Sequence, residues 1–340
     1  MNSTVVRARR LIAATALAAV LAVPLAGCIP ITITERSVFF PPQREGAKAT
    51  DSVSLADRWM ANANASAQTI SRPAPDTVRL LPADAWARFI SMDARHFLAG
   101  PEGQRIAFTL STPVEGAAGA DRLAPAAVRP LIVVCGGNAT DRYSSGVAYA
   151  QKALRWGDVL HFDYPGYGDS QGEPSAEGFE SGTDVVRAEV ARVAAGRPVI
   201  YWGHSLGGFV CTDLAGGTPG VAGIIIETSA RNATEVARSW TPLWAKPIAR
   251  VRVAESLAGY DNATTAAATG APVLVVGAGR DETLPVELSR SLGEALRELG
   301  APVTYVEFPD ARHFDVPRQP TFTANLDTFF QSLRPENPQP

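Results

Sequence analysis

Short runs of mostly apolar residues recur between residues 131 and 308, and segments with helical spacing separate them. The runs are rich in Val, Ile and Leu, a pattern typical of strands buried on both faces of a parallel sheet. They lie at residues 131–135, 159–164, 199–202, 221–226, 273–276 and 303–308. The helical segments lie at residues 143–156, 183–195, 285–299 and 322–333. This alternation predicts an α/β fold with a doubly wound, mostly parallel sheet and helices on both faces.

The boundaries of the domain follow from where this alternation begins and where it is interrupted. Residues 95–98 and 105–110 are expected to form a β-hairpin, and the core domain is expected to span residues 78–335. The less regular residues 231–270 interrupt the alternation and are expected to form a small cap insertion. Residues 28–77 contain several prolines and carry no chemical motif, so we expect a tether and an irregular N-terminal segment there.

Composition narrows the class of protein. The 340 residues are 46% hydrophobic and 19% charged, enough to bury a large core and unlike a disordered chain. The net charge of −3 gives no electrostatic reason to expect nucleic acid as a partner. We therefore expect one large globular domain or two small ones, with no nucleic-acid partner.

The first 28 residues have the pattern of an export signal. Three arginines between positions 7 and 10 precede an apolar stretch at residues 11–23, which is short for a membrane span. Leu25-Ala26-Gly27 then stands before Cys28, a sequence similar to the lipobox of bacterial lipoproteins. The resemblance implies that residues 1–27 are a signal peptide and that Cys28 is lipidated. The protein would then be anchored in the cell envelope, facing away from the cytoplasm, at the outer membrane or the periplasmic face in a Gram-negative host. An ordinary secretory signal with a chance cysteine is the alternative.

Only two further cysteines follow, Cys135 and Cys211. Two cysteines do not make a disulfide framework, so we expect both to be small buried residues. A bridge between them remains open.

A strand–turn–helix around a serine is the feature that points to chemistry. The run at 199–202 ends in Gly203-His204-Ser205-Leu206-Gly207, and a helical segment follows. A serine on such a strained turn stands clear of the sheet, and the glycines two residues before and after it leave room for the tight turn. We expect Ser205 to be the nucleophile.

An acid and a base follow later strands at the same edge of the predicted sheet. Asp281 comes after the strand at 273–276, and His313 comes after the strand at 303–308. A histidine can take the proton of the serine hydroxyl, and a carboxylate can orient the imidazole. We expect Asp281 rather than its neighbour Glu282 or the more distant Asp310 to be the acid.

Two backbone amides are expected to hold the oxyanion of the reaction. One belongs to Leu206, directly after the nucleophile, and the other belongs to the loop 136–139, where we favour Asn138. His204 flanks the serine, and we expect its side chain to point elsewhere.

Residues 78–333 resemble the α/β-hydrolase superfamily, and most of all its compact branch of monoacylglycerol-lipase-like, serine-aminopeptidase-like and depalmitoylase-like enzymes. The resemblance rests on the loop 136–139, the turn 163–170, the elbow around Ser205, and the pair Asp281 and His313. In that family the turn 163–170 is structural. The usual His-Gly pair before the oxyanion residue is replaced here by two glycines.

These features together predict a membrane-tethered serine hydrolase that cleaves carboxylic esters or thioesters, with no metal and no organic cofactor. A peptidase or an acyltransferase would use the same triad, and a non-catalytic binding module on this fold is a third alternative. Because the cap insertion is short, we expect a short or medium acyl group. Trp240 and Trp244 in that insertion are candidates for the wall of an acyl pocket, although a helix packed on the core would show the same spacing.

Overall fold

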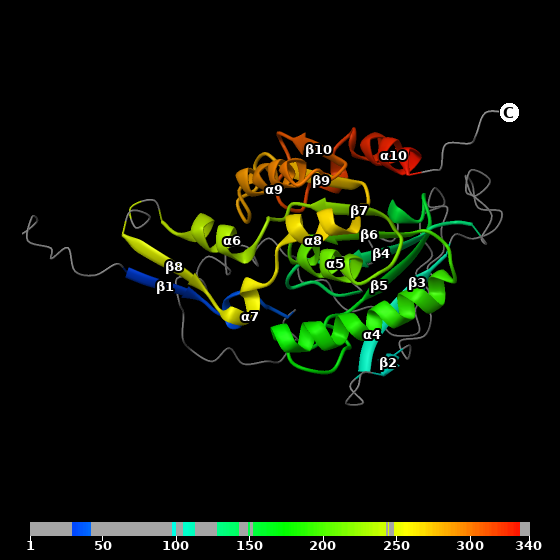
Figure 1. Ribbon diagram of the computed structural model, residues 1–340, viewed down its shortest axis with the longest axis horizontal. Helices are drawn as coiled ribbons and strands as arrows, with labels where there is room; N and C mark the ends of the chain where they lie inside the picture. Colours follow the sequence, from blue (N-terminus) through cyan, green and yellow to red (C-terminus); the bar gives the residue numbers. More distant parts are fainter. Residues whose placement is uncertain are drawn as a thin grey trace, which may run out of the picture.

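The computed structural model describes the chain at residues 29–41, 97–99, 105–112, 128–142, 149, 152–242, 244 and 248–333. Eight of its strands form one sheet in the order β10-β9-β7-β6-β4-β5-β3-β2 (Figure 1). They are β2 (Phe97–Ala99), β3 (Arg105–Ser111), β4 (Leu131–Cys135), β5 (Asp158–Phe162), β6 (Val199–His204), β7 (Val221–Glu227), β9 (Val273–Ala278) and β10 (Val303–Phe308). The strands β10, β9, β7, β6, β4 and β5 pair in parallel in this order. Strand β3 pairs antiparallel with β5, and β2 pairs antiparallel with β3. The predicted fold class and the hairpin are confirmed.

Helices cover both faces of the sheet, and each face has its own apolar cluster. One face packs against α4 (Ala176–Ala194), α5 (Leu206–Gly216), α8 (Asn262–Thr269) and α9 (Val286–Glu298). The other face packs against α10 (Phe322–Ser332) and against Tyr149, Ala153 and Leu154. Strands β4, β5, β6 and β9 are buried along their whole length, and β4 and β9 are continuous runs without a charged residue.

Two predicted helices differ from the structure or extend beyond its described part. Helix α4 begins seven residues earlier than expected, with Ser175 as its N-cap accepting a hydrogen bond from the Gly178 amide. The early start was missed because glycines at 178 and 182 are poor helix formers. Gly182 is needed for packing, since a β-carbon there would lie 2.8 Å from Pro165. Most of the helix predicted at 143–156, like the segments 1–28 and 42–96, lies outside the described residues.

The expectation of an irregular tether is wrong for residues 29–41. Strand β1 (Ile29–Ile33) pairs in parallel with β8 (Ala249–Val253), and the short 3-10 helix η1 (Glu35–Ser37) follows. Phe39 is then 7% exposed and stacks on Phe179 of α4 with ring centroids 4.5 Å apart. Burial of this aromatic ring explains why the segment lies on the core domain.

Part of the predicted insertion at 231–270 belongs to the core domain. The insertion contains α6 (Ala233–Trp240), β8 and the short helix α7 (Glu255–Ala258), and it ends with α8. Helix α8 buries Ala263 and Ala266 in the same apolar cluster as α5, so it belongs to the helical layer of the core. Helix α7 also buries Leu257 in that cluster. Helix α6 and strand β8 lie toward the left of the view in Figure 1, with β1 beside β8.

Candidate active site

Ser205 occupies the strained turn that the motif predicts. It connects β6 to α5 with φ 55° and ψ −117°, a conformation that costs energy for a residue with a β-carbon. A β-carbon on Gly203 would lie 2.1 Å from the Gly207 carbonyl oxygen, and one on Gly207 would lie 2.0 Å from the Cys135 carbonyl oxygen. No side chain fits at either position, which is why both are glycine.

Two hydrogen bonds hold the turn from the neighbouring strand. The Ser205 amide donates to the Glu227 carbonyl oxygen at 2.9 Å, and the Ser229 hydroxyl donates to the Ser205 carbonyl oxygen at 2.8 Å. Both partners lie at the carboxyl end of β7, where parallel strands of this kind of sheet present their ligand sites. The end of β7 therefore supports the strained turn.

The structure brings the predicted acid and base into contact. Asp281 Oδ2 lies 2.6 Å from His313 Nδ1, and both side chains are at least 95% buried. The other carboxylate oxygen of Asp281 accepts hydrogen bonds of 2.8 Å from the amides of Thr283 and Leu284. With its oxygens occupied in this way, the carboxylate is fixed in one orientation toward the imidazole.

Neither rival carboxylate occupies this place. Asp310 pairs with Arg280 at the surface, where both side chains are mostly exposed. Glu282 is also exposed. Of the three carboxylates considered, Asp281 is the one that contacts His313.

His204 was missed as part of the site. Its Nε2 lies 3.1 Å from the His313 carbonyl oxygen, and the two imidazole rings are 4.9 Å apart between centroids. Burial, followed by the nearby His313, lowers the pKa of His204 to about 3, so the ring is neutral at physiological pH. A neutral ring that meets a carbonyl with Nε2 must carry its proton there. His204 thus holds the backbone of the base, and the signal for it was its place beside the serine.

Side chains of the turn 163–170 hold the loop 136–139. The family resemblance implied a structural role for this turn. The Tyr164 hydroxyl donates to the Gly136 carbonyl oxygen at 2.6 Å, and the Tyr167 hydroxyl donates to Asn138 Oδ1 at 2.7 Å. Within the described residues, the Asn138 amide N–H has no hydrogen-bond acceptor. It is therefore free to donate to a ligand.

The N-terminal segment holds the same loop from the other side. Asn138 Nδ2 donates to the Val38 carbonyl oxygen, and Asn138 Oδ1 accepts from the Phe40 amide at 2.8 Å. The Ala139 amide donates to the Phe40 carbonyl oxygen, also at 2.8 Å. Sequence reasoning could not find these contacts, because nearly one hundred residues separate their partners.

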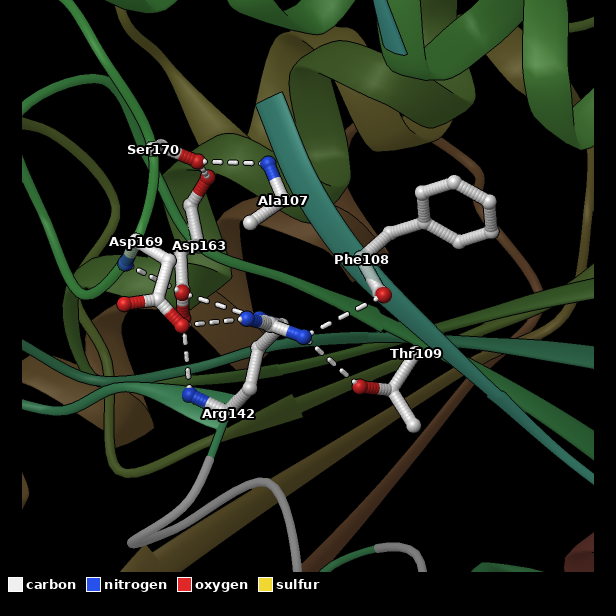
Figure 2. A network of polar contacts seen from close by, with 7 residues as sticks. All are labelled: Ala107, Phe108, Thr109, Arg142, Asp163, Asp169 and Ser170. Carbon is white, nitrogen blue, oxygen red and sulfur yellow. Dashed lines mark hydrogen bonds and ion pairs between the residues drawn. The ribbon is translucent and has the colours of Figure 1, made fainter. Parts of the chain in front are cut away.

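Arg142 fixes the turn that carries the two tyrosines. Figure 2 shows its guanidinium between the turn and strand β3, donating to Asp163 and Asp169 on one side and to the Phe108 carbonyl oxygen on the other. Asp163 is buried, and its desolvation raises its pKa, although the Arg142 charge opposes this. An unpaired charge could not remain buried there, so Arg142 and Asp163 depend on each other.

A disulfide joins Cys135, at the end of β4, to Cys211 in α5. The bridge between these two cysteines, which the sequence left open, is therefore present in the structure. The bond connects the strand that leads into the loop 136–139 with the helix that begins at Leu206. It holds together the two backbone segments expected to supply the oxyanion amides.

The two tryptophans of the insertion lie in different surroundings. Helix α6 ends at Trp240 because Thr241 is extended, and Trp240 donates its indole N–H to the Thr283 carbonyl oxygen beside Asp281. Trp244 lies beyond the helix and is 73% exposed. Trp240 is partly buried against the apolar cluster of Ala230, Leu284 and Leu288. A role of either tryptophan in an acyl pocket stays a prediction.

Comparison with known proteins agrees with this architecture. Residues 131–254 match the alpha/beta hydrolase family. An esterase of Pyrococcus furiosus, Pf2001, superimposes with a TM-score of 0.52 over 78% of this chain and 97% of its own, at 12% identity. The fold is that of the α/β-hydrolases. A thermophilic esterase of Thermogutta terrifontis superimposes with a TM-score of 0.51 over 71% of this chain and 99% of its own, at 17% identity.

Two curated relatives are similar in sequence. The uncharacterized protein Rv2307c of Mycobacterium tuberculosis is 33% identical over 55% of this chain and 63% of its own length. The lysophosphatidylserine lipase ABHD12 of Danio rerio is 27% identical over 61% of this chain and 59% of its own length. The chain thus spans about six-tenths of the length of these relatives.

Proposed function

We propose that the protein is a serine hydrolase that cleaves carboxylic esters or thioesters through an acyl-enzyme. The observation that carries this proposal is the 2.6 Å contact between His313 Nδ1 and Asp281 Oδ2, on loops that follow the strands β10 and β9. Ser205 stands on a strained turn of the same sheet, at the carboxyl end of β6. A serine, a base and a buried carboxylate in this chain order are the parts that acyl transfer requires.

In the proposed mechanism His313 Nε2 takes the proton of Ser205 as the hydroxyl oxygen attacks the substrate carbonyl carbon. Asp281 keeps the Nδ1 proton of His313 in place and stabilises the imidazolium. The amides of Leu206 and Asn138 donate to the oxyanion. His313 then returns the proton to the leaving alcohol or thiol, and water hydrolyses the acyl-enzyme with the same base.

Substrates with a single acyl chain fit the proposal best. A lysophosphatidylserine lipase is among the relatives, and such a lipid carries one acyl ester. Phe314, beside His313, is 52% exposed and adds apolar surface near the reacting groups. Because the insertion is small, we expect the rate of p-nitrophenyl ester cleavage to be highest between acetate and octanoate. A steep rise toward palmitate would contradict this chain-length preference.

We further propose that a lipid on Cys28 tethers the enzyme outside the cytoplasm. Residues 1–28 lie outside the described part of the structure, and none of the described helices is both long and apolar enough to cross a bilayer. The Cys135–Cys211 disulfide supports an oxidising compartment, because reducing cytosol disfavours such bonds. Mass spectrometry of the mature N-terminal peptide tests the tether. An unmodified Cys28 would contradict it.

Labelling with a fluorophosphonate probe tests the catalytic mechanism. We expect the protein to be labelled on Ser205, and Ser205→Ala to abolish both labelling and ester hydrolysis. Ser256→Ala, at an exposed serine of α7, is the matched control and should change neither. His313→Ala should be as inactive as Ser205→Ala, and the double variant little worse, because the residues act as a unit. Substantial hydrolysis by folded Ser205→Ala protein would overturn the mechanism.

A further inference from the structure

One edge of the insertion combines exposed apolar side chains with exposed positive charge. Trp244 is 73% exposed and Ile248 is 47% exposed, two of the few large apolar side chains at the surface of the described chain. Arg250 and Arg252 follow on β8, and both are exposed. We call these four residues the cap edge.

The alternation of β8 separates the two kinds of side chain cleanly. Successive residues of a strand point to opposite faces, so Arg250 and Arg252 lie on one face and Val251 and Val253 on the other. Val253 packs partly against the core, whereas the arginine face is exposed. Among the described residues, neither arginine has an ion-pair partner within the protein. The charges are therefore available to a ligand outside the protein.

The register of the two-stranded sheet places the start of β1 beside the start of β8. Ile29 pairs with Ala249, and the strands run in parallel, so the first residue of β1 lies next to the start of β8 (Figure 1). Cys28 precedes Ile29 in the sequence and is covalently one residue away, about 3.8 Å between Cα atoms. A lipid on Cys28 would therefore emerge at the cap edge.

We infer that the cap edge docks on a bilayer surface that contains anionic phospholipids. Tryptophan favours the interface between water and lipid, where its ring is buried among headgroups and its N–H remains hydrated. Ile248 adds exposed apolar area, and the two arginines attract lipid phosphates. The inference uses the proposed tether only for orientation, because the exposed side chains and the register are observed without it.

Docking at this edge orients the candidate site relative to the lipid. Trp240 connects the end of α6 to the Thr283 carbonyl oxygen, beside Asp281, so the insertion that carries the cap edge also contacts the acid loop.

A fluorescent probe at the cap edge tests the inference. In Cys28→Ser protein the two remaining native cysteines, Cys135 and Cys211, are joined, so an introduced cysteine can be labelled with a polarity-sensitive dye, with the unlabelled parent protein as the blank. Ile248→Cys places the dye in the cap edge. Leu299→Cys is the matched control, since Leu299 is 50% exposed and follows α9, outside the insertion.

The labelled Cys28→Ser protein is incubated with phosphatidylcholine vesicles, with and without phosphatidylglycerol and a lipid-borne quencher. We expect the dye at 248 to shift to the blue and be quenched on anionic vesicles, and the dye at 299 to remain in water. Arg250→Gln together with Arg252→Gln should weaken docking about 30-fold, since each basic residue near an anionic surface contributes about fivefold. Trp244→Ala should weaken it further.

Several results would overturn the inference. One is an equal blue shift and equal quenching of the two dyes on anionic vesicles, and another is docking that the two arginine substitutions do not weaken. A third is a blue shift without vesicles that rises with protein concentration, which would indicate contact with a second copy of the chain. The readout does not depend on catalysis, so it can be repeated with Ser205→Ala. Hydrolysis of a water-soluble ester should be unchanged by the two arginine substitutions. A loss of hydrolysis would mean that the arginines act in the catalytic reaction and not in docking.

Discussion

Glu227 is a fully buried carboxyl group next to the candidate nucleophile, and its ionisation should make stability fall as pH rises. Its carboxyl oxygens accept hydrogen bonds from the Tyr149 hydroxyl at 2.9 Å and the Trp202 indole at 3.2 Å. Lys152 is the nearby cation, and its own pKa is lowered by burial. Desolvation raises the pKa of Glu227 to about 7, while these partners oppose the rise.

The sign of the pH dependence follows from the two states of the chain. Below pH 4.5, the ordinary pKa of the group, Glu227 is protonated whether the protein is folded or not. Between pH 4.5 and about 7 the unfolded chain loses this proton and the folded chain keeps it, so the free energy of unfolding decreases as pH rises. Above about 7 the decrease is complete. At about 1.4 kcal/mol for each unit of pKa, it amounts to about 3 kcal/mol.

Glu227→Gln should remove this dependence. The amide keeps an acceptor for the Trp202 indole N–H, and its NH2 group can donate to the Tyr149 oxygen. We expect the variant to match the parent near pH 4 and to be more stable by up to about 3 kcal/mol at pH 8. Urea denaturation followed by circular dichroism from pH 4 to 9 measures the difference.

The difference between variant and parent isolates Glu227. The buried histidines His161 and His204, whose pKa values are lowered to about 3, change stability in the opposite direction but equally in both proteins. Glu298→Gln, at an exposed glutamate of α9, is the control and should show no pH-dependent difference. A stability difference for Glu227→Gln that is constant with pH, or largest in acid, would refute the reasoning.

Three further outcomes follow from the contacts of the site. Asp281→Asn should lower kcat for ester hydrolysis by about 10⁴-fold, as expected when the wrong imidazole tautomer forms, whereas the surface variant Asp310→Asn should match the parent; equal kinetics of the two would exclude Asp281 as the acid. Phe39→Ala should lower the free energy of unfolding by about 3 kcal/mol, because a buried aromatic ring is removed. It should also reduce kcat, because the loop around Asn138 loses its support. Unchanged kinetics and an unchanged melting temperature would contradict this. Replacing Cys135 and Cys211 by alanine together should cost about 4 kcal/mol of stability by the chain-entropy estimate, and the variant should lose activity at a lower urea concentration than the parent; coincident unfolding curves would count against a structural role for the bond.

The reacting groups were predictable because each is marked locally. Ser205 lies in a five-residue motif with glycines at the two positions where a β-carbon would clash. Asp281 and His313 each come shortly after an apolar strand. Parallel strands bring their carboxyl ends to one edge, so chain order alone placed the acid and the base together. Their catalytic roles remain predictions.

The supports of the site could not be predicted, because they depend on distant pairings. Phe39 packs on Phe179, 140 positions later, and no local pattern marks this contact. Cys135 and Cys211 gave no information on pairing until β4 and α5 were placed side by side. The short apolar spacing near Trp240 and Trp244 suggested one continuous helix, and only the extended Thr241 decides that it stops.

The pairing of β1 with β8 has a consequence for the order of folding. Ile29 and Ala249 are 220 positions apart, and closing a loop of that length costs about 5 kcal/mol of chain entropy before any contact is gained. The parallel core joins strands much nearer in sequence, so it should form first, and the N-terminal segment should attach afterwards. Because that segment completes the support of Asn138, refolded protein should recover its core signal early and its hydrolytic activity only in a later, slower phase.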